Sequence, residues 1–185
     1  MEIKNLTKIF GKKIVFNNYS LLIPENKITY IMGESGSGKT TLLRMISGID
    51  KDFSGEIIGC PDRISYVFQE PRLFPSLNVR SNIEIIEKGG DMTVDNVLEL
   101  TELNNDALLT PDELSGGMKM RLSIARALYY NGDTFLMDEP FSALDDELKK
   151  RILPKIFEYL KGKTVIIVSH NINEAEKYAD NVVKL

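Results

Sequence analysis

Hydrophobic and polar positions alternate in two different ways along this chain. Residues 2–10 and 14–23 alternate polar with apolar side chains, which is typical of antiparallel strands with one wet face. Four later segments are almost uniformly apolar and predict buried parallel strands: residues 28–32, 64–68, 134–137 and 165–169. Helical patterns separate these segments. The sequence therefore predicts an α/β fold, in which helices flank a mainly parallel sheet and a small antiparallel β layer is added.

A long, mostly helical region lies between the second and third predicted parallel strands. In "TVDNVLELTEL", apolar residues fall on one helical face and Thr93 is available as the N-cap. A similar stripe consists of Met118, Leu122, Ala125 and Tyr129. Such stripes are usually core packing, not ligand sites. We interpret residues 71–132, approximately, as a helical subdomain inserted into one domain that spans residues 1–185.

Composition narrows the class of protein. A chain of 185 residues with 43% hydrophobic residues is long enough for one sizeable core. The net charge of −4 and the lack of a basic run argue against a protein that binds nucleic acid without specificity. The single cysteine, Cys60, has no internal partner, and the first ten residues lack the apolar region of a secretory signal. The cytosol fits best, and the apolar runs are too short to cross a membrane.

The stretch "IMGESGSGKTTLLRMISG" contains the pattern G-x-x-x-x-G-K-[ST] between a predicted strand and a predicted helix. Its glycines allow backbone N–H groups to surround phosphate oxygens, and Lys39, which we expect to be exposed, reaches the β and γ phosphates. The Thr40 hydroxyl is a ligand for Mg²⁺, and Gly48 is placed to end the helix. The alternative is a glycine-rich turn with a solvated lysine. The pattern predicts a site for a nucleotide triphosphate without specifying the reaction.

Polar residues follow the predicted parallel strands at one edge of the sheet, where open α/β sheets bind ligands. Asp138 is placed to hold Mg²⁺, and Glu139 to act as the general base that polarises the attacking water. His170, the single histidine, is placed to contact a γ-phosphate, and Gln69 to complete the metal shell or orient water. The alternatives without a catalytic or binding role are a helix cap for Asp138, an ordinary loop amide for Gln69 and a surface or core histidine for His170.

A second phosphate-binding device is predicted in "LSGGMKMRLSIARAL". Ser115 is placed as a helix N-cap, and Gly116 and Gly117 leave backbone donors uncovered at the positive end of the helix dipole. Simple capping with a flexible entry is an equally good interpretation from the residues alone. If both devices bind phosphate, one of them is expected to serve the nucleotide of a neighbouring molecule.

Taken together, these motifs resemble the nucleotide-binding subunit of an ABC (ATP-binding cassette) transporter, a P-loop NTPase. In order, they resemble the Walker A loop "GESGSGKT", the Q-loop at Gln69, the signature "LSGGM", the Walker B strand "TFLMDE", the D-loop "SALD" ending at Asp145, and the switch histidine His170. The resemblance covers essentially the whole chain. It implies that Phe10 stacks on adenine.

The site residues that follow from the motifs and the resemblance fall into four groups. ATP-binding residues are Phe10, Gly33, Glu34, Ser35, Gly36, Ser37, Gly38, Lys39, Thr40 and Thr41. Residues that bind the ATP of a second molecule are Ser115, Gly116, Gly117 and Asp145. Catalytic residues are Glu139, His170, Gln69 and Lys39, and metal ligands are Thr40, Gln69 and Asp138. The implied cofactors are ATP and Mg²⁺.

The segments "VFQEPRLFPSLNV" and "DEPFSALD" are similar to those of importer subunits for nitrate, sulfonate, taurine and related solutes. Met118 stands where the family commonly has glutamine. Relative to the family, the chain is short at its C-terminus. The resemblance implies an ATPase that dimerises with a second copy of itself. It would sit at the inner face of the cell membrane, attached only through transmembrane permease subunits and without nucleic acid. The alternatives are an exporter subunit, a non-transport ABC ATPase in translation or chromosome maintenance, and a cassette that binds nucleotide without turnover.

Overall fold

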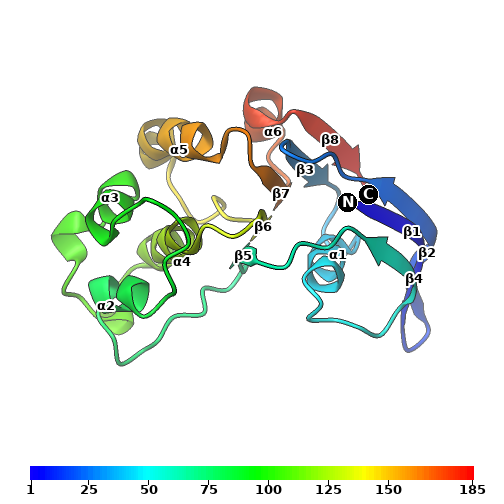
Figure 1. Ribbon diagram of the computed structural model, residues 1–185, viewed down its shortest axis with the longest axis horizontal. Helices are drawn as coiled ribbons and strands as arrows, with labels where there is room; N and C mark the ends of the chain where they lie inside the picture. Colours follow the sequence, from blue (N-terminus) through cyan, green and yellow to red (C-terminus); the bar gives the residue numbers. More distant parts are fainter.

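A computed structural model describes residues 1–185 and contains two β-sheets (Figure 1). The antiparallel sheet has the order β2-β1-β4 and is formed by β1 (Glu2–Phe10), β2 (Lys13–Leu22) and β4 (Ser54–Ile58). The parallel sheet has the order β5-β6-β7-β3-β8 and is formed by β5 (Ile64–Val67), β6 (Thr134–Asp138), β7 (Thr164–Val168), β3 (Ile28–Met32) and β8 (Asn181–Lys184). The predicted α/β fold with a small antiparallel layer is confirmed.

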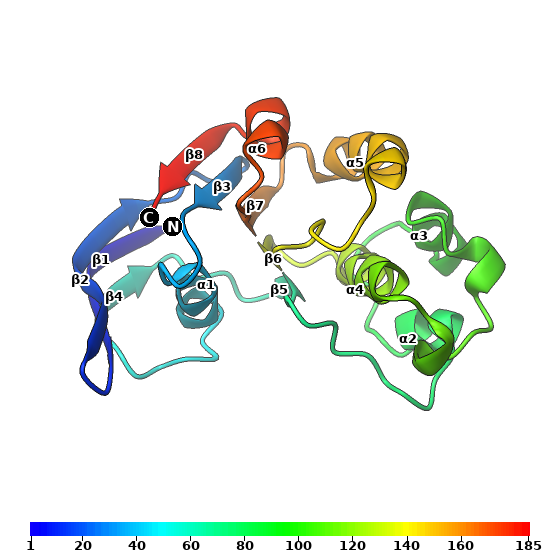
Figure 2. The same cartoon turned by 180° about the vertical axis from the view of Figure 1, so that it is seen from behind.

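Six α-helices accompany the sheets. They are α1 (Lys39–Ile46), α2 (Val79–Glu84), α3 (Val94–Leu100), α4 (Gly116–Tyr130), α5 (Asp146–Leu160) and α6 (Ile172–Tyr178), and two 3-10 turns lie at Asn104–Asp106 and Pro111–Glu113. Helices α2, α3 and α4 lie at the end of the molecule opposite the antiparallel sheet (Figure 2), within the range expected for the inserted subdomain. None of the helices combines the length and the apolar character needed to cross a membrane.

The sequence pattern does not predict the fifth parallel strand, β8. It pairs with β3 from Thr29–Asn181 to Met32–Lys184 at the edge of the sheet. Its residues alternate between half-buried and exposed, because an edge strand is covered on fewer sides than a central one. The uniformly apolar pattern that revealed the central strands is therefore absent from β8. The other predicted strands are correct within one residue at each end.

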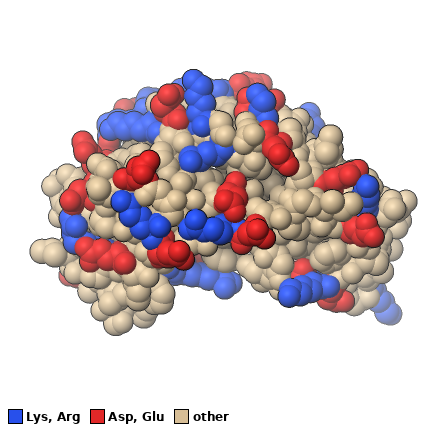
Figure 3. Space-filling view, in the orientation of Figure 1, with Lys and Arg blue, Asp and Glu red and all other residues tan.

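Two hydrophobic clusters pack on opposite faces of the parallel sheet, as the period of two along a strand requires. In β3, Tyr30 and Met32 belong to a cluster of 29 buried residues that includes residues of α3, α4 and α5. Ile31 belongs to a second cluster of 13 buried residues, shared with α1 and the antiparallel sheet. The predicted stripe on α4 packs in the larger cluster. On the surface, basic and acidic side chains are intermixed on the face drawn in Figure 3.

Asn82 in α2 holds the loop that leads from β5 to this helix. Its side chain is fully buried, and its carbonyl oxygen accepts from the Phe74 N–H at 2.9 Å. Its amide nitrogen donates to the backbone carbonyls of Phe74, Leu77 and Asn78 at 3.1, 2.8 and 3.1 Å. Among these groups, the Phe74 N–H and the Leu77 carbonyl have no backbone partner, so the Asn82 side chain satisfies them.

We expect Asn82→Ala to lower the free energy of unfolding by about 1–3 kcal/mol, because the Phe74 N–H and the Leu77 carbonyl lose the side chain that satisfies them. Urea unfolding of the variant measures this loss. Asn105→Ala, at an exposed position, is the matched control and should unfold like the wild type. Equal stability of the two variants would contradict this role of Asn82.

Candidate nucleotide-binding site

A cavity of about 650 Å³ opens at the carboxyl ends of the central parallel strands. Sequence-predicted residues that line it are Phe10, Gly33, Glu34, Ser35, Gly36, Gly38, Lys39, Thr40, Thr41, Gln69, Asp138, Glu139 and His170. Residues far apart in the sequence therefore meet at one site, as expected from the edge of a parallel sheet. Of the residues predicted to bind the chain's own ATP, Ser37 alone does not line the cavity.

The loop between β3 and α1 exposes the start of the helix toward the cavity. Gly38, the N-cap of α1, has φ = 102° and, as a glycine, has no side chain that could accept a hydrogen bond from the helix. No acidic residue occupies the first turn. A Cβ atom on Gly38 would lie 2.6 Å from Val15 Cγ1, so only glycine fits here. The first N–H groups of α1 consequently have no side-chain acceptor, and the positive end of the helix dipole faces the cavity.

Lys39 is the first residue of α1 and is 9% exposed, so the expectation of an exposed lysine is wrong. Its Nζ atom donates to the carbonyl oxygens of Gly33 and Glu34, each at 2.8 Å. The loop curls around the ammonium and provides backbone acceptors, which keeps a buried charge hydrogen-bonded. The lysine therefore bridges the two ends of the loop while remaining on the wall of the cavity.

Asp138 ends β6 and is 2% exposed. Its Oδ1 atom has no hydrogen-bond partner in the protein. Burial raises the pKa of Asp138, and the charge of Glu139 acts in the same direction, whereas the Thr40 hydroxyl opposes the shift. A buried carboxylate oxygen without a donor, beside a hydroxyl, fits an oxygen-binding cation such as Mg²⁺. No cluster of three or more His, Cys, Asp or Glu side chains suited to a metal occurs in the chain.

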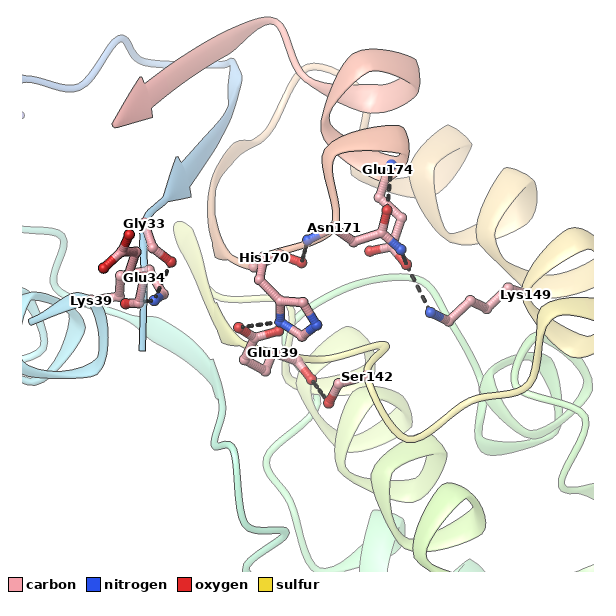
Figure 4. A network of polar contacts seen from close by, with 10 residues as sticks. Gly33, Glu34, Lys39, Glu139, Ser142, Lys149, His170, Asn171 and Glu174 are labelled. Carbon is pink, nitrogen blue, oxygen red and sulfur yellow. Dashed lines mark hydrogen bonds and ion pairs between the residues drawn. The ribbon is translucent and has the colours of Figure 1, made fainter. Parts of the chain in front are cut away.

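Glu139 and His170 both line the cavity, and their side chains contact each other (Figure 4). Glu139 Oε1 lies 3.1 Å from His170 Nδ1. Glu139 has φ = 50°, a left-handed conformation that is uncommon outside glycine, and its N–H donates to the Val168 carbonyl of β7 at 2.9 Å. The Ser142 hydroxyl donates to the Glu139 carbonyl at 2.9 Å. The backbone around Glu139 is thus fixed, and its carboxylate points to the imidazole.

Phe10 and Gln69 lie on the rim of the cavity, and both are exposed. Phe10 is the last residue of β1, and Lys8 Nζ lies 4.7 Å from the centroid of its ring. Four further residues, which the sequence patterns do not predict, line the cavity: Lys13, Val15, Ser142 and Val168. Lys13 and Val15 belong to the alternating pattern of β2, in which no feature distinguishes a ligand-facing residue. Ser142 follows Glu139 by three residues, and this short spacing is the feature of the sequence that could have predicted its place beside Glu139.

The four residues predicted to serve a second molecule lie outside the cavity. Ser115 is the N-cap of α4 and its Oγ accepts from the Met118 N–H at 3.2 Å. Gly116 is open, since a Cβ there would meet no atom within 4 Å, whereas a Cβ on Gly117 would lie 2.9 Å from the Ala143 carbonyl. Asp145 is the N-cap of α5, and the hydrogen bond from the Leu148 N–H lowers its pKa. Both serine and aspartate therefore have a capping role within the chain.

Curated proteins with similar sequences include several import ATP-binding proteins. An Fe(3+) ions import ATP-binding protein of Haemophilus influenzae is 35% identical over 205 aligned residues, which cover 98% of this chain and 58% of the relative. An aliphatic sulfonates import ATP-binding protein of Pseudomonas syringae pv. tomato is 34% identical over 187 residues, which cover 99% of this chain and 81% of the relative. The chain thus spans little more than half of the length of the Haemophilus relative.

Solved structures with the same fold include a dimer of the ATP-binding cassette MJ0796 in a post-hydrolysis state, bound to ADP and Pi. It has a TM-score of 0.84 and 31% sequence identity, over 100% of this chain and 93% of that chain. The family model described as ABC transporter matches residues 16–142, which contain the phosphate loop, Gln69, the signature segment and the Asp138–Glu139 pair. On this match and on relatives above 30% identity, the chain belongs to the ABC transporter family.

Proposed function

We propose that this chain is an ATP-binding and ATP-hydrolysing subunit that powers a membrane transporter. The observation that carries the proposal is the single cavity in which three devices meet: the uncapped start of α1 with Lys39, the unpartnered oxygen of Asp138, and the Glu139–His170 pair. Anion binding, metal binding and general-base chemistry are the three requirements of nucleotide hydrolysis.

Lys39 and the backbone N–H groups from Gly33 to Thr41 bind the phosphates of ATP. The Lys39 ammonium donates to two carbonyls of the loop. Phosphate oxygens compete with those acceptors, because they carry negative charge and the carbonyl oxygens are neutral. The exposed ring of Phe10, on the rim of the same cavity, stacks on the adenine.

Thr40, Asp138 and Gln69 would hold Mg²⁺, which would neutralise negative charge on the phosphates of the nucleotide. Thr40 supplies a hydroxyl and Asp138 a carboxylate oxygen that lacks a protein donor. The cost of burying Asp138 in the empty protein is offset when the cation binds, so the aspartate is poised for the metal.

Glu139 is the general base. Its carboxylate accepts a proton from the water that attacks the γ-phosphorus, while the bond from phosphorus to the bridging oxygen breaks and ADP leaves. His170 Nδ1 lies 3.1 Å from Glu139 Oε1 and orients the carboxylate. The histidine side chain is 72% exposed whereas that of Glu139 is 14% exposed, so the imidazole covers the base on its solvent side.

A second copy of the chain completes the site. Ser115, Gly116, Gly117 and Asp145 lie outside the chain's own cavity, and the structural neighbour with ADP and Pi is a dimer. The Ser115 oxygen accepts one hydrogen bond as N-cap, and its hydroxyl proton remains free to donate to a phosphate. In a head-to-tail two-fold dimer each Ser115 reaches the partner's γ-phosphate, and two ATP molecules join the subunits.

The groove beside the Gln69 segment binds a transmembrane permease. It has a volume of about 410 Å³ and is lined by Tyr66, Phe68, Arg72, Ile85, Arg126 and Tyr130, among others. Tyr66 and Phe68 stack with ring centroids 4.0 Å apart, and the Arg72 guanidinium lies 4.4 Å from the Phe68 ring centroid. An apolar floor with arginines suits a cytoplasmic permease helix that carries an acidic residue. Phe68 directly precedes Gln69, so the permease and the nucleotide contact the same segment.

The relatives named above are import proteins for iron and for sulfonates. We place this chain in the same role, as the energy-supplying subunit of an importer for a small solute at the inner face of the cell membrane. Its attachment to the membrane is through the permease.

Glu139→Gln is expected to stop hydrolysis while the phosphate contacts remain. The variant should form a dimer with MgATP and return to a monomer with ADP, measured by light scattering on a size-exclusion column. A variant that binds ATP yet stays monomeric at a protein concentration of roughly tens of micromolar would contradict the proposed dimer with shared ATP sites. Ser115→Arg added to Glu139→Gln should prevent dimerisation, because the long side chain fills the position of the partner's phosphate.

Asp138→Asn is expected to stabilise the nucleotide-free protein. Since folding raises the pKa of Asp138 above its ordinary 3.8, the cost of burying its charge is fully present at neutral pH and is lost as the pH falls through the folded-state pKa. The variant should melt about 2–4 °C above the wild type at neutral pH, the effect of roughly 1 kcal/mol in a chain of this size. This difference should shrink in acid.

The same variant should lose the enhancement of ATP affinity by Mg²⁺, measured by nucleotide titration with and without the ion. The exposed Asp62→Asn is the matched control and should change neither the melting temperature nor the effect of Mg²⁺. A lower melting temperature for Asp138→Asn at neutral pH would contradict the interpretation that burying the Asp138 carboxylate destabilises the protein.

Phe74→Asp is expected to weaken binding of the permease. The Phe74 side chain is 42% exposed, and its ring centroid lies 5.0 Å from the guanidinium carbon of Arg126, which lines the groove. Co-purification with a co-expressed permease measures assembly, and a thermal melt reports the fold. A lowered melting temperature together with lost assembly would instead indicate that Phe74 is needed for packing.

A further inference from the structure

The backbone on both sides of His170 is anchored, while its side chain is not. Ser169 N donates to the Ile31 carbonyl at 3.3 Å, and Asn171 N donates to Ser169 Oγ at 3.1 Å. The imidazole has one polar contact, with Glu139, and is 72% exposed. The position of the ring over Glu139 therefore depends on where its two neighbours hold the backbone.

Asn171 is itself held by Glu174 through a reciprocal pair of bonds. Asn171 is the N-cap of α6, and its Oδ1 accepts from the Glu174 N–H at 3.2 Å. Its Nδ2 donates back to Glu174 Oε1 at 2.9 Å. The carboxylate of Glu174 thereby fixes the side chain that starts the helix directly after His170.

Lys149 provides the charge that balances Glu174. Its Nζ lies 2.9 Å from Glu174 Oε1, and the two side chains are 17% and 9% exposed (Figure 4). This ion pair joins α5 to α6. By contrast, the neighbouring Lys150 pairs with Glu147 on the same helix, and those side chains are 69% and 76% exposed. Only the first pair is shielded from solvent enough for its loss to leave an uncompensated charge.

We propose that Lys149 is a positioning residue for His170, acting through Glu174 and Asn171. Without the ammonium, the nearly buried Glu174 carboxylate has the Asn171 amide as its remaining side-chain donor. It then turns toward solvent and releases the cap of α6, and the imidazole moves off Glu139. The inference rests on the proposed role of His170 in hydrolysis and extends it to a helix that does not line the cavity.

The chain contains a single histidine, so one pair of imidazole ¹⁵N signals in an NMR spectrum reports the His170–Glu139 contact without any enzymatic assay. Glu139→Ala gives the signals of the uncontacted ring. We expect Lys149→Met to move the signals toward those of Glu139→Ala. Lys150→Met, the matched control, should leave them at the wild-type positions, and Lys149→Arg should restore them.

Turnover provides the second readout. Lys149→Met should lower kcat roughly tenfold, a typical share of a general-base contribution, with KM for ATP unchanged. Combined with His170→Ala, it should cause no further loss, because both changes remove the same contact. Lys150→Met should keep the wild-type kcat.

The outcomes separate the inference from the function on which it rests. Wild-type turnover in His170→Ala would overturn the role of His170 and the inference with it. If His170→Ala lowers kcat, the inference alone fails under either of two results. One is that Lys149→Met leaves the imidazole signals where Lys150→Met leaves them, even with a lower melting temperature. The other is that Lys149→Met lowers kcat equally in the His170→Ala background.

Discussion

The uncapped N-terminus of α1 is the constraint on which the site depends. Gly38 starts the helix in a left-handed conformation that a side chain would block against Val15, and no acidic residue neutralises the first turn. A helix start without side-chain acceptors is costly unless water or a ligand supplies them. β3 delivers this start to the same edge at which β6 ends in Asp138 and β7 leads to His170. The order of the strands converts an unsatisfied helix end into a binding site.

Most of the residues that line the cavity could be predicted from sequence patterns, because each pattern is local. A phosphate loop, a strand that ends in two carboxylates and a serine N-cap each occupy a few consecutive residues, and their period or spacing is visible directly. The burial of Lys39 was not predictable, because it depends on how the loop carbonyls of Gly33 and Glu34 fold over the side chain. The edge strand β8 and the lining residue Lys13 were missed for a similar reason. Their half-exposed surroundings leave no distinctive pattern in the sequence.

Several residues combine a structural task with a proposed functional one. Ser115 and Asp145 cap α4 and α5 within the chain, and both are proposed to meet the nucleotide of a second copy. Gly117 packs against the Ala143 carbonyl, so the signature segment and the loop before α5 are in contact in one molecule. Lys149 lies one helical turn after Asp145 on α5. Residues proposed to face the partner and residues that support His170 are therefore carried by one rigid helix.

The two carbonyl contacts of Lys39 have a consequence for the speed of nucleotide exchange. The ammonium is satisfied before ATP arrives, so binding replaces hydrogen bonds and the net gain is the difference between the two sets. The same acceptors stabilise the lysine after the proposed product, ADP, has left, so less free energy is lost on release. A lysine without internal acceptors would bind the proposed nucleotide more tightly and release it more slowly. The internal acceptors thus favour weaker binding and a shorter residence time of the nucleotide.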